Sequence, residues 1–440
     1  MAEVLSKVRL AKDASVKLAT VPSGVRSAAL LKIASEIKNG SKKLLRENAK
    51  DLAEAERLLK SGKISSAFVQ RLKLTEDKIK DISEMVRSVA NLDDPIGKTL
   101  YAVEMDKGLE VYKVTCPMGL IGAVFEARPD VLPQISSLCL KSANAVVLKG
   151  GKEAKHSNRA FYSIIRDASE RSGIPKGWIQ IVEERRDVME LLKLDDNVDL
   201  LVPRGSKEFI KHTQANTRIP VLGHAEGICH VYVDEDANLK KAMEISYDAK
   251  VQYPAVCNSM ETLLVHRAVA DRLISSLAKR YKAAGVEIRG DTKTRKIIPW
   301  AKPATEKDWR TEYLDLIISI KVVDSLQEAI DHINRYGSRH TDAIVTEDKG
   351  AALKFMTEVD SSSVMVNAST RFSDGYRYGL GAEVGISTGK IHARGPVGLE
   401  GLTTTKYCVI GAGHIVSTYA GKRAKPFTHR PIAKGKKILG

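Results

Sequence analysis

Short apolar runs alternate with amphipathic helical stretches along residues 119–223, and this alternation constrains the fold more than any other feature. The runs are "GLIGAVFE", "AVVLKGG", "IQIVE", "VDLLVP" and "IPVLG". Between them lie stretches with helical spacing of apolar residues, such as "SNRAFYSIIRDASERSG". Strands that are apolar on both faces and joined by helices predict parallel β-α-β units, and therefore a doubly wound α/β sheet.

A second series of the same kind begins near residue 236. Its apolar runs, "TLLVH", "VEIRG", "LIISIKVV", "DAIVT" and "SVMVNAS", alternate with helical stretches such as "ADRLISSLAKRYKAAG". A chain of 440 residues is too long for one hydrophobic core, so we expect two doubly wound α/β domains. The region before residue 90 has helical spacing throughout. After it, "LYAVEMD" and "LEVYKVTCP" flank Asp106-Lys107-Gly108, which predicts a β-hairpin.

Charge and composition narrow the classes of protein. The net charge is +16, and the segment 421–440 holds seven Lys or Arg and no acid, which predicts a flexible basic tail. A basic body attracts anionic ligands, either a nucleic acid or a phosphorylated metabolite or cofactor. Aromatic residues make up only 5%, so platforms for stacking bases are few and we expect no nucleic-acid partner. No run of about 18 apolar residues occurs, so we expect no membrane span.

The cysteines point to a reducing compartment. There are five, an odd number, and no C-x-x-C pair occurs among them. Such a set gives no disulfide framework and no metal-binding motif, so we expect a cytoplasmic protein without a metal site. The N-terminal segment carries Glu3 and Asp13 between its apolar residues, which is typical of a surface helix and not of a signal peptide.

Two glycine-containing turns are candidates for binding a phosphate. A G-x-G-x-x-G motif after an early strand is absent, and the glycines of 379–385 come late and carry one residue too many. "LKGGKE" at 148–153 and "VPRGS" at 202–206 each follow a predicted parallel strand, where ligands of open α/β sheets bind. The alternative is that these glycines only serve tight turns.

Cys257 departs from the usual pattern of a buried cysteine. It follows Pro254 in a turn, and polar Asn258 and Ser259 come directly after it. It also lies near the predicted boundary between the two domains, where clefts form. A loop thiol with backbone amides nearby can act as a nucleophile through its thiolate, although a small buried residue is the alternative.

The stretch "YPAVCNSMETLLVH" around Cys257 resembles the active-site loop of the gamma-glutamyl phosphate reductase family, within the aldehyde dehydrogenase superfamily. "PMGLIGAVFEARPDV", "LKSANAVVLKGGKEAKHSN", "IPVLGHAEGICHVYVD" and "VNASTRFSDGYRYGLGAEVGISTGKIHARGPVGLEGLTT" resemble that family in the same order. The resemblance covers roughly residues 5–415. It implies an α/β, aldehyde-dehydrogenase-like fold: two doubly wound α/β domains plus an oligomerisation element made of a β-hairpin and a strand.

The resemblance also divides the chain by role. It implies a cofactor-binding domain over 1–98 and 115–236 and a catalytic domain over 237–372. The oligomerisation element comprises 99–114 and 395–420. Residues 421–440 have no counterpart in the resemblance and remain the expected flexible tail; the alternative is that they fold over a neighbouring subunit, with Phe427 and Ile432 as anchors.

The activity that the resemblance implies is an NADP-dependent oxidoreductase of proline biosynthesis. It reduces L-glutamyl 5-phosphate to L-glutamate 5-semialdehyde and phosphate through a cysteine thioester, with NADPH as the hydride donor. Cys257 matches the nucleophile. Arg128 stands where hydrolytic relatives keep an oxyanion-binding Asn, and Asn258 is a further candidate for the oxyanion or the substrate.

The residues expected to bind the glutamyl end come from "NASTRF" and "HARGP", namely Asn367, Arg371, His392 and Arg394. Hydrolytic relatives carry a general-base Glu where this chain has Leu222. Without that base, water should attack the thioester slowly, which suits a reductase. Glu226 lies nearby in the sequence and is the alternative position for a base.

The resemblance also places the cofactor. Lys149 matches a lysine that contacts the ribose, and Gly205-Ser206 matches the turn that binds the pyrophosphate. Lys152 stands where NAD-specific relatives often carry a Glu, and a cation there attracts the 2′-phosphate of NADPH. Glu312 matches a Glu that holds the nicotinamide ribose.

The expected partners are a small-molecule substrate, further copies of the chain in a homo-oligomer, and a separate glutamate 5-kinase, because the kinase half of fused relatives is absent from the sequence. Two other classes of function stay open. One is a hydrolytic aldehyde dehydrogenase with another substrate, and the other is a non-enzymatic protein that binds nucleic acid through its charge.

Overall fold

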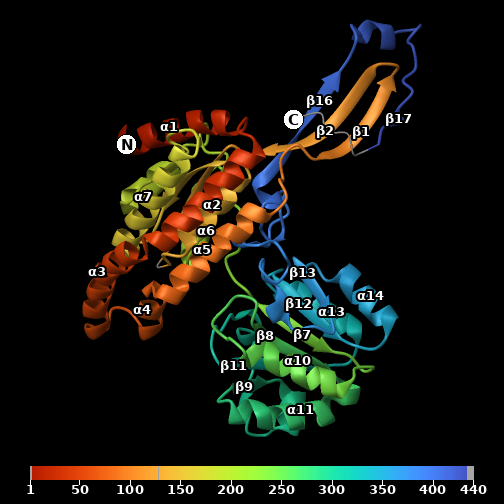
Figure 1. Cartoon of the computed structure of the whole chain (residues 1–440). Helices are drawn as coiled ribbons and strands as arrows, with labels where there is room; N and C mark the ends of the chain where they lie inside the picture. Colours follow the sequence, from red (N-terminus) through yellow and green to blue (C-terminus); the bar gives the residue numbers. More distant parts are fainter. Residues whose placement is uncertain (1, 127, 434–440) are drawn as a thin grey trace.

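The computed structural model describes residues 2–126 and 128–433 (Figure 1). Its N-terminal region is helical, as the spacing predicted. The Thr75 side chain caps the last helix of this region by accepting a hydrogen bond from the backbone of Lys78, and Glu76 and Asp77 occupy its first turn. The helices are α1 (Ala2–Leu18), α2 (Ser23–Asn39), α3 (Ser41–Lys60), α4 (Ser66–Leu72) and α5 (Glu76–Asn91).

The first α/β domain is built on a four-stranded parallel sheet in the order β5-β4-β3-β6. Every residue of its central strand β3 is buried, as expected for a strand covered on both faces. The run "IPVLG" does not form the strand we expected, because only Val221 bridges the sheet, beside Leu201. The elements are β3 (Leu120–Phe125), α6 (Val131–Lys141), β4 (Ala145–Lys149), η1 (Lys152–Ala154), α7 (Lys155–Arg171), β5 (Ile179–Ile181), α8 (Arg185–Leu191), β6 (Leu200–Arg204) and α9 (Lys207–Ala215).

The second domain contains a seven-stranded parallel sheet in the order β10-β9-β11-β8-β7-β12-β13. Its strand β7 begins before the boundary that we expected at residue 236, so that boundary was placed too late by one strand. Helices α10, α11, α13 and α14 connect its strands. The elements are β7 (Cys229–Val233), α10 (Leu239–Val251), β8 (Met260–His266), α11 (Arg267–Ala283), β9 (Glu287–Gly290), α12 (Thr292–Ile297), β10 (Lys302–Pro303), η2 (Asp308–Arg310), β11 (Ile317–Val323), α13 (Leu326–Tyr336), β12 (Thr341–Val345), α14 (Lys349–Glu358) and β13 (Ser363–Val366).

A separate four-stranded sheet projects from the two domains (Figure 1). The predicted hairpin forms its centre as β1 (Thr99–Asp106) and β2 (Leu109–Pro117), and β16 (Thr403–Ile410) pairs with β2 along eight residues. The start of the expected 395–420 segment lies elsewhere, because β15 (Gly395–Pro396) pairs with β14 (Ile386–Ser387). Short 3-10 turns flank β16 as η4 (Glu400–Leu402) and η5 (Val416–Tyr419), whereas η3 (Thr370–Phe372) follows β13 and packs in the second domain.

The basic tail is docked where we expected it to be flexible. Its strand β17 (Arg430–Pro431) pairs with β1, and the Phe427 ring stacks on Tyr419 with 4.6 Å between the ring centroids. Asp106 accepts hydrogen bonds from Lys425 and from the Tyr419 hydroxyl. These bonds, with Lys425 the strongest, lower the pKa of Asp106 to about 2. The rest of the tail, 434–440, lies outside the described residues.

Each α/β domain has its own apolar core. One cluster of buried side chains fills the first domain around β3, β4 and β6, and it includes Trp178 and Phe161. Two clusters cover the two faces of the seven-stranded sheet. Among the described residues, no helix combines the length and the hydrophobicity that crossing a membrane requires.

Candidate active site

The two α/β domains meet at opposite ends of their strands. Arg204 closes β6 at the carboxyl edge of the first sheet, and its charge interacts with Glu383 and with the thiol of Cys257. Cys257 precedes β8 at the amino edge of the second sheet. Lys207, which begins α9, forms an ion pair with Glu226 in the segment leading to β7. The junction therefore brings the predicted nucleophile to the edge where the first domain was expected to bind phosphate.

Cys257 is half-buried in the turn between α10 and β8, and its main chain is tightly held. Its carbonyl oxygen accepts a hydrogen bond from Cys229 Sγ at 3.2 Å. A Cβ atom on Gly227 would overlap that same carbonyl group, so only glycine fits there. Both flanks of the turn are also joined, because Lys250 Nζ lies 2.6 Å from a Glu261 carboxylate oxygen in a fully buried ion pair.

Two histidines that sequence reasoning missed lie beside the thiol. Polar atoms of His224 and His340 and the Cys257 sulfur all lie within 4.8 Å of one another. His224 Nδ1 is 2.7 Å from the carbonyl oxygen of Ile386, and burial lowers the pKa of His224, so the ring is neutral near pH 7 with its proton on Nδ1. His340 is fully buried next to Thr341.

The signals that could have found these histidines were in the motifs already quoted. His224 stands two residues after Leu222 in "VLGHAEG", and His340 stands in "RHTDAIVTED". Periodicity relates residues within one helix or strand. His224, Cys257 and His340 precede three different strands, β7, β8 and β12, so their spacing in the sequence does not predict that they meet. Only the topology of the sheet brings them together.

Leu222 and Glu226, the two positions considered for a hydrolytic base, are both engaged elsewhere. Leu222 is buried in the core of the first domain, and its backbone N–H donates to Leu201. The Glu226 carboxylate pairs with Lys207 and, at 3.4 Å, with Lys211. The carboxylate nearest in sequence to the missing base is therefore held by two cations of α9.

Two of the predicted substrate residues, Asn258 and Arg371, lie around the thiol, and a third, Arg128, lies near Arg204. Asn258 is buried and donates from Nδ2 to the Ser373 carbonyl oxygen at 2.8 Å, while its Oδ1 has no partner among the described residues. Arg371 is buried, and its charge interacts with the Cys257 thiol. Burial lowers the pKa of Arg204, and the charge of the exposed Arg128 nearby lowers it further. Arg204 itself was quoted in a motif but not selected.

The other three predicted substrate residues have polar partners in other parts of the described chain. Asn367 has a positive φ of 52°, and its amide bonds both the N–H and the carbonyl of Thr346, which is a structural role. His392 Nε2 is 2.9 Å from the Gly401 carbonyl oxygen. Arg394 pairs with the carboxylate of Asp360 at 2.9 Å.

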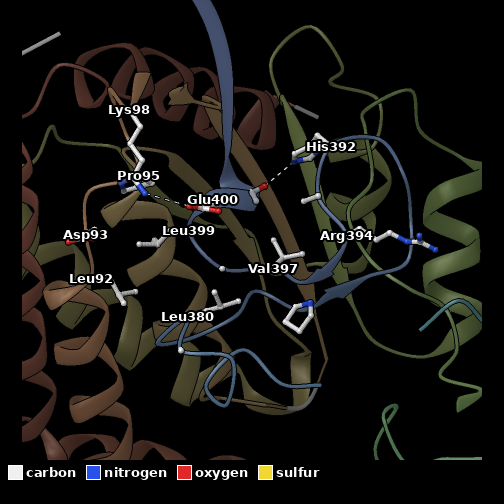
Figure 2. A pocket seen from close by; sticks show the side chains of 15 residues that line it. Leu92, Asp93, Pro95, Lys98, Leu380, His392, Arg394, Val397, Leu399 and Glu400 are labelled. Carbon is white, nitrogen blue, oxygen red and sulfur yellow. Dashed lines mark hydrogen bonds and ion pairs between the residues drawn. The ribbon is translucent and has the colours of Figure 1, made fainter. Parts of the chain in front are cut away.

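His392 and Arg394 line a separate pocket of about 440 Å³ (Figure 2). Figure 2 shows Leu380, Val397 and Leu399 among the apolar side chains that line it. Cys257 does not line this pocket. The clustering of cations in "HARGP" thus reflects this pocket and the Asp360 ion pair.

The predicted cofactor residues follow strands of the first sheet. Lys149 ends β4, and Lys152 is exposed at the start of η1. A Cβ on Gly150 between them would overlap the amide of Asn158, whose Oδ1 is buried without a partner in the described structure. A tight glycine turn with an unsatisfied buried acceptor fits the ribose end of a dinucleotide.

The Gly205-Ser206 turn presents backbone N–H groups at the start of α9. Ser206 Oγ caps this helix by accepting from Phe209, and the Ser206 backbone N–H donates to the Glu126 carboxylate at 3.2 Å. A Cβ on Gly205 would lie 2.8 Å from Glu126 Cδ. A carboxylate thus already bonds the amide that would bind a pyrophosphate, which matches the anion preference of a helix N-terminus.

Glu312 lies on the side of the second domain. Its Oε1 accepts a hydrogen bond from the Gly227 N–H at 2.8 Å, and burial raises its pKa. A cleft of about 640 Å³ runs beside it between the domains. Among the residues that line this cleft are the cations Lys207, Arg310, Arg335 and Arg339, together with His224. The cleft therefore suits an anionic ligand that reaches toward the thiol.

Comparisons with known proteins agree with this geometry. The aldehyde dehydrogenase family pattern matches residues 1–298. A gamma-glutamyl phosphate reductase from Natronomonas pharaonis is 58% identical over 96% of this chain and 97% of its own length. The crystal structure of a gamma-glutamyl phosphate reductase from Thermotoga maritima, 40% identical, superposes with a TM-score of 0.90 over 94% of this chain and 99% of its own.

A more distant structure shares the fold alone. Glyceraldehyde-3-phosphate dehydrogenase from Methanocaldococcus jannaschii, solved in complex with NADP, is 17% identical, with a TM-score of 0.65 over 93% of this chain and 94% of its own. The two closer matches span nearly the whole chain. The chain therefore belongs to the aldehyde dehydrogenase family and, within it, to the gamma-glutamyl phosphate reductases.

Proposed function

We propose that this chain reduces L-glutamyl 5-phosphate to L-glutamate 5-semialdehyde and phosphate, the second step of proline biosynthesis from glutamate. The observation that carries the proposal is the half-buried Cys257 thiol, held at the junction of two α/β domains with Arg204 and Arg371 close to it. The names of the relatives that match nearly the whole chain support the same substrate.

In the first step Cys257 attacks the acyl carbon of the substrate. His224 is neutral and close to the thiol, so it accepts the thiol proton. The carbon–oxygen bond to the phosphoryl group then breaks, the phosphate leaves with the bonding electrons, and a glutamyl thioester remains on the sulfur. Arg204 and Arg128 balance the charge of the departing phosphate, because guanidinium groups bind phosphate oxygens in pairs.

In the second step the thioester becomes an aldehyde. Bound NADPH supplies the hydride that the thioester carbon requires. Asn258 and backbone N–H groups of the Cys257 turn stabilise the resulting oxyanion. Its collapse breaks the carbon–sulfur bond, releases the aldehyde and leaves a thiolate, which recovers its proton from His224. Leu222 has no carboxylate and Glu226 is paired with Lys207, so neither of these two positions supplies the base of a hydrolytic relative, and the thioester survives until it is reduced.

Cofactor binding falls to the first domain in this proposal, and catalysis to the second. Lys149 would hold the ribose, and the Gly205-Ser206 turn, whose Ser206 N–H here donates to Glu126, would hold the pyrophosphate. Lys152 selects NADPH over NADH through its charge. Glu312 bonds the nicotinamide ribose from the opposite wall of the cleft.

We further propose that the projecting sheet joins copies of the chain. Its outer strand β16 exposes Tyr407, Val409 and Ile410, apolar side chains beside an open edge of backbone groups. A separate glutamate 5-kinase would supply the labile acyl phosphate, and the reaction would take place in the cytoplasm.

The reverse reaction tests the proposal. Glutamate 5-semialdehyde and NADP⁺ are mixed with the enzyme, with and without phosphate, and NADPH is followed by absorbance. Sustained turnover is expected only with phosphate, because only phosphate releases the glutamyl group from sulfur. Without phosphate the signal should stop after a single turnover. Sustained turnover without phosphate would instead identify a hydrolytic aldehyde dehydrogenase.

A further inference from the structure

Cys257, His224 and His340 together have the composition of a transition-metal site. Their ligand atoms lie within 4.8 Å of one another, although the three residues are far apart in the sequence. No spacing of Cys and His residues predicted this cluster, and we expected no metal site from the sequence. One thiolate and two imidazoles form a set that suits zinc, which also accepts a water molecule as its fourth ligand.

Both imidazoles are oriented as metal ligands usually are. A metal-binding histidine commonly uses its second ring nitrogen for a hydrogen bond to a carbonyl or another polar group, which fixes the tautomer and the ring. His224 does so from Nδ1 to the Ile386 carbonyl oxygen at 2.7 Å. His340 Nδ1 lies 2.9 Å from Thr341 Oγ1. In both rings Nε2 is the nitrogen left for a ligand.

His340 supplies an independent observation. It is fully buried, and its Nε2 has no hydrogen-bond partner among the described residues. A buried polar atom without a partner is costly, typically about 1–3 kcal/mol, so its persistence calls for an explanation. A metal ion that binds Nε2 satisfies that atom.

The present spacing is somewhat wider than a metal-bound one. Zinc–sulfur and zinc–nitrogen bonds of about 2.3 Å and 2.0–2.1 Å at tetrahedral angles place ligand atoms roughly 3.3–3.6 Å apart. The cluster must therefore contract by about 1 Å. Cys257 lies in a turn and not in a regular element, so rotation of its side chain can provide much of that contraction.

We propose that Zn²⁺ binds reversibly to Cys257 Sγ, His224 Nε2 and His340 Nε2 and blocks the nucleophile. Binding follows from the three side chains alone, whereas inhibition rests on the proposed function, in which Cys257 attacks the substrate. The Cys257 thiol loses its proton to solvent as its sulfur binds the metal, and no electron is transferred. Zinc and the acyl phosphate then compete for one sulfur atom.

Cobalt is the spectroscopic probe, because Co²⁺ occupies zinc sites and a cobalt–thiolate bond absorbs in the near ultraviolet. The full chain, reduced and freed of metal with a chelator, is titrated with Co²⁺. We expect a charge-transfer band that saturates at one ion per chain and that Zn²⁺ removes by displacement. Absence of the band, or its saturation only by nonspecific excess, overturns the proposal.

Variants locate the ion. Cys257→Ser should abolish the band, whereas Cys408→Ser, which removes a half-buried thiol of the projecting sheet, should leave it intact. His340→Asn should weaken binding by at least tenfold. Thr341→Val leaves all three ligands in place and should weaken it about 10-fold to 100-fold by freeing the ring. A band that persists in Cys257→Ser places the metal elsewhere and overturns the assignment.

Inhibition is measured separately on the wild-type enzyme. Zn²⁺ should raise the apparent KM for the acyl substrate, and a chelator should restore full activity. If the cobalt band forms at Cys257 and zinc does not inhibit, the metal site stands and the role of Cys257 as nucleophile fails. If zinc inhibits equally in His340→Asn and in wild type, inhibition arises at another site and this part of the proposal is overturned.

Discussion

The two parallel sheets present opposite edges to the same junction. In the first domain, Lys149 ends a strand and Glu126 and Ser206 follow strands, all at the carboxyl edge. In the second domain, Cys257 and His340 precede strands, at the amino edge. The carboxyl edge offers turns that lead into helices, whose N–H groups attract anions. The amino edge offers turns held on both sides by buried chain, which fixes a reacting atom.

This difference predicts that substitutions in the Cys257 turn of the second edge affect chemistry, whereas those at the cofactor turns of the first edge affect which cofactor binds. Removal of the nucleophile should have the largest effect. Cys257→Ser should reduce turnover by at least about 10³-fold, because a hydroxyl with the same neighbours is a far weaker nucleophile at neutral pH. Steady-state assays with NADPH measure this loss, and circular dichroism checks the fold. Retention of a few per cent of activity would sink the mechanism.

The second largest effect is expected when the packing of Gly227 against the Cys257 turn is disturbed. Gly227→Ala places a methyl group on the Cys257 carbonyl, so the turn must shift. A displacement of about 1 Å at a reacting atom can cost roughly 10²-fold in rate, so we expect a loss of that order in kcat.

The matched control is Gly24→Ala in α2. A Cβ there meets no atom within 4 Å, so kcat should be unchanged. Equal turnover in the two variants would show that the amino-edge turn does not need its tight packing.

At the first edge, Lys152→Glu should change selectivity and not chemistry. A carboxylate repels the 2′-phosphate, so the dissociation constant for NADPH should rise by about tenfold or more while that for NADH changes little. Lys279→Glu, an exposed site on α11 in the other domain, is the control with the same change of charge. Fluorescence titrations at low and high salt measure both constants. An unchanged ratio in Lys152→Glu removes this residue from the cofactor site.

Removal of the tail from the projecting sheet should have the smallest effect on catalysis and on cofactor binding. A chain that stops at Ala420 loses β17 and the Lys425 pair with Asp106, but no residue of the two domain cores. We expect kcat to stay within about twofold and Tm to fall by no more than about 4 °C, since the tail pairs along only two residues. Thermal unfolding and sedimentation decide this, and a larger loss or a smaller oligomer means that the tail supports assembly.

The two sheets and the hairpin could be predicted from the sequence, because strands and tight turns depend on the order of apolar, polar and turn residues over short stretches. The all-apolar run of β3 and the Asp106-Lys107-Gly108 turn are readable within ten residues. Sequence reasoning missed the docking of the tail, because that depends on the buried face of Asp106, more than 300 residues away in the chain.

The residues of the candidate site likewise fall into those that the sequence predicted and those that it could not. Cys257 and the phosphate turns lie at strand ends that the pattern marks, and the family resemblance strengthened them. His224 and His340 could not be found, because their approach to the thiol follows from the order β8-β7-β12 in the sheet. Arg394 and Asn367 were selected for their residue types; Arg394 pairs with Asp360 and Asn367 bonds the Thr346 backbone, and a role of either in substrate binding stays a prediction.

The most direct test of the account is to trap the acyl-enzyme. The enzyme is mixed with glutamate 5-semialdehyde and NADP⁺ in the absence of phosphate, quenched in acid, digested and examined by mass spectrometry. The account predicts one glutamyl group in thioester linkage on the peptide that contains Cys257, removed when phosphate is added before the quench. A stable enzyme without this adduct, or an adduct on Cys229 or another cysteine, would contradict it.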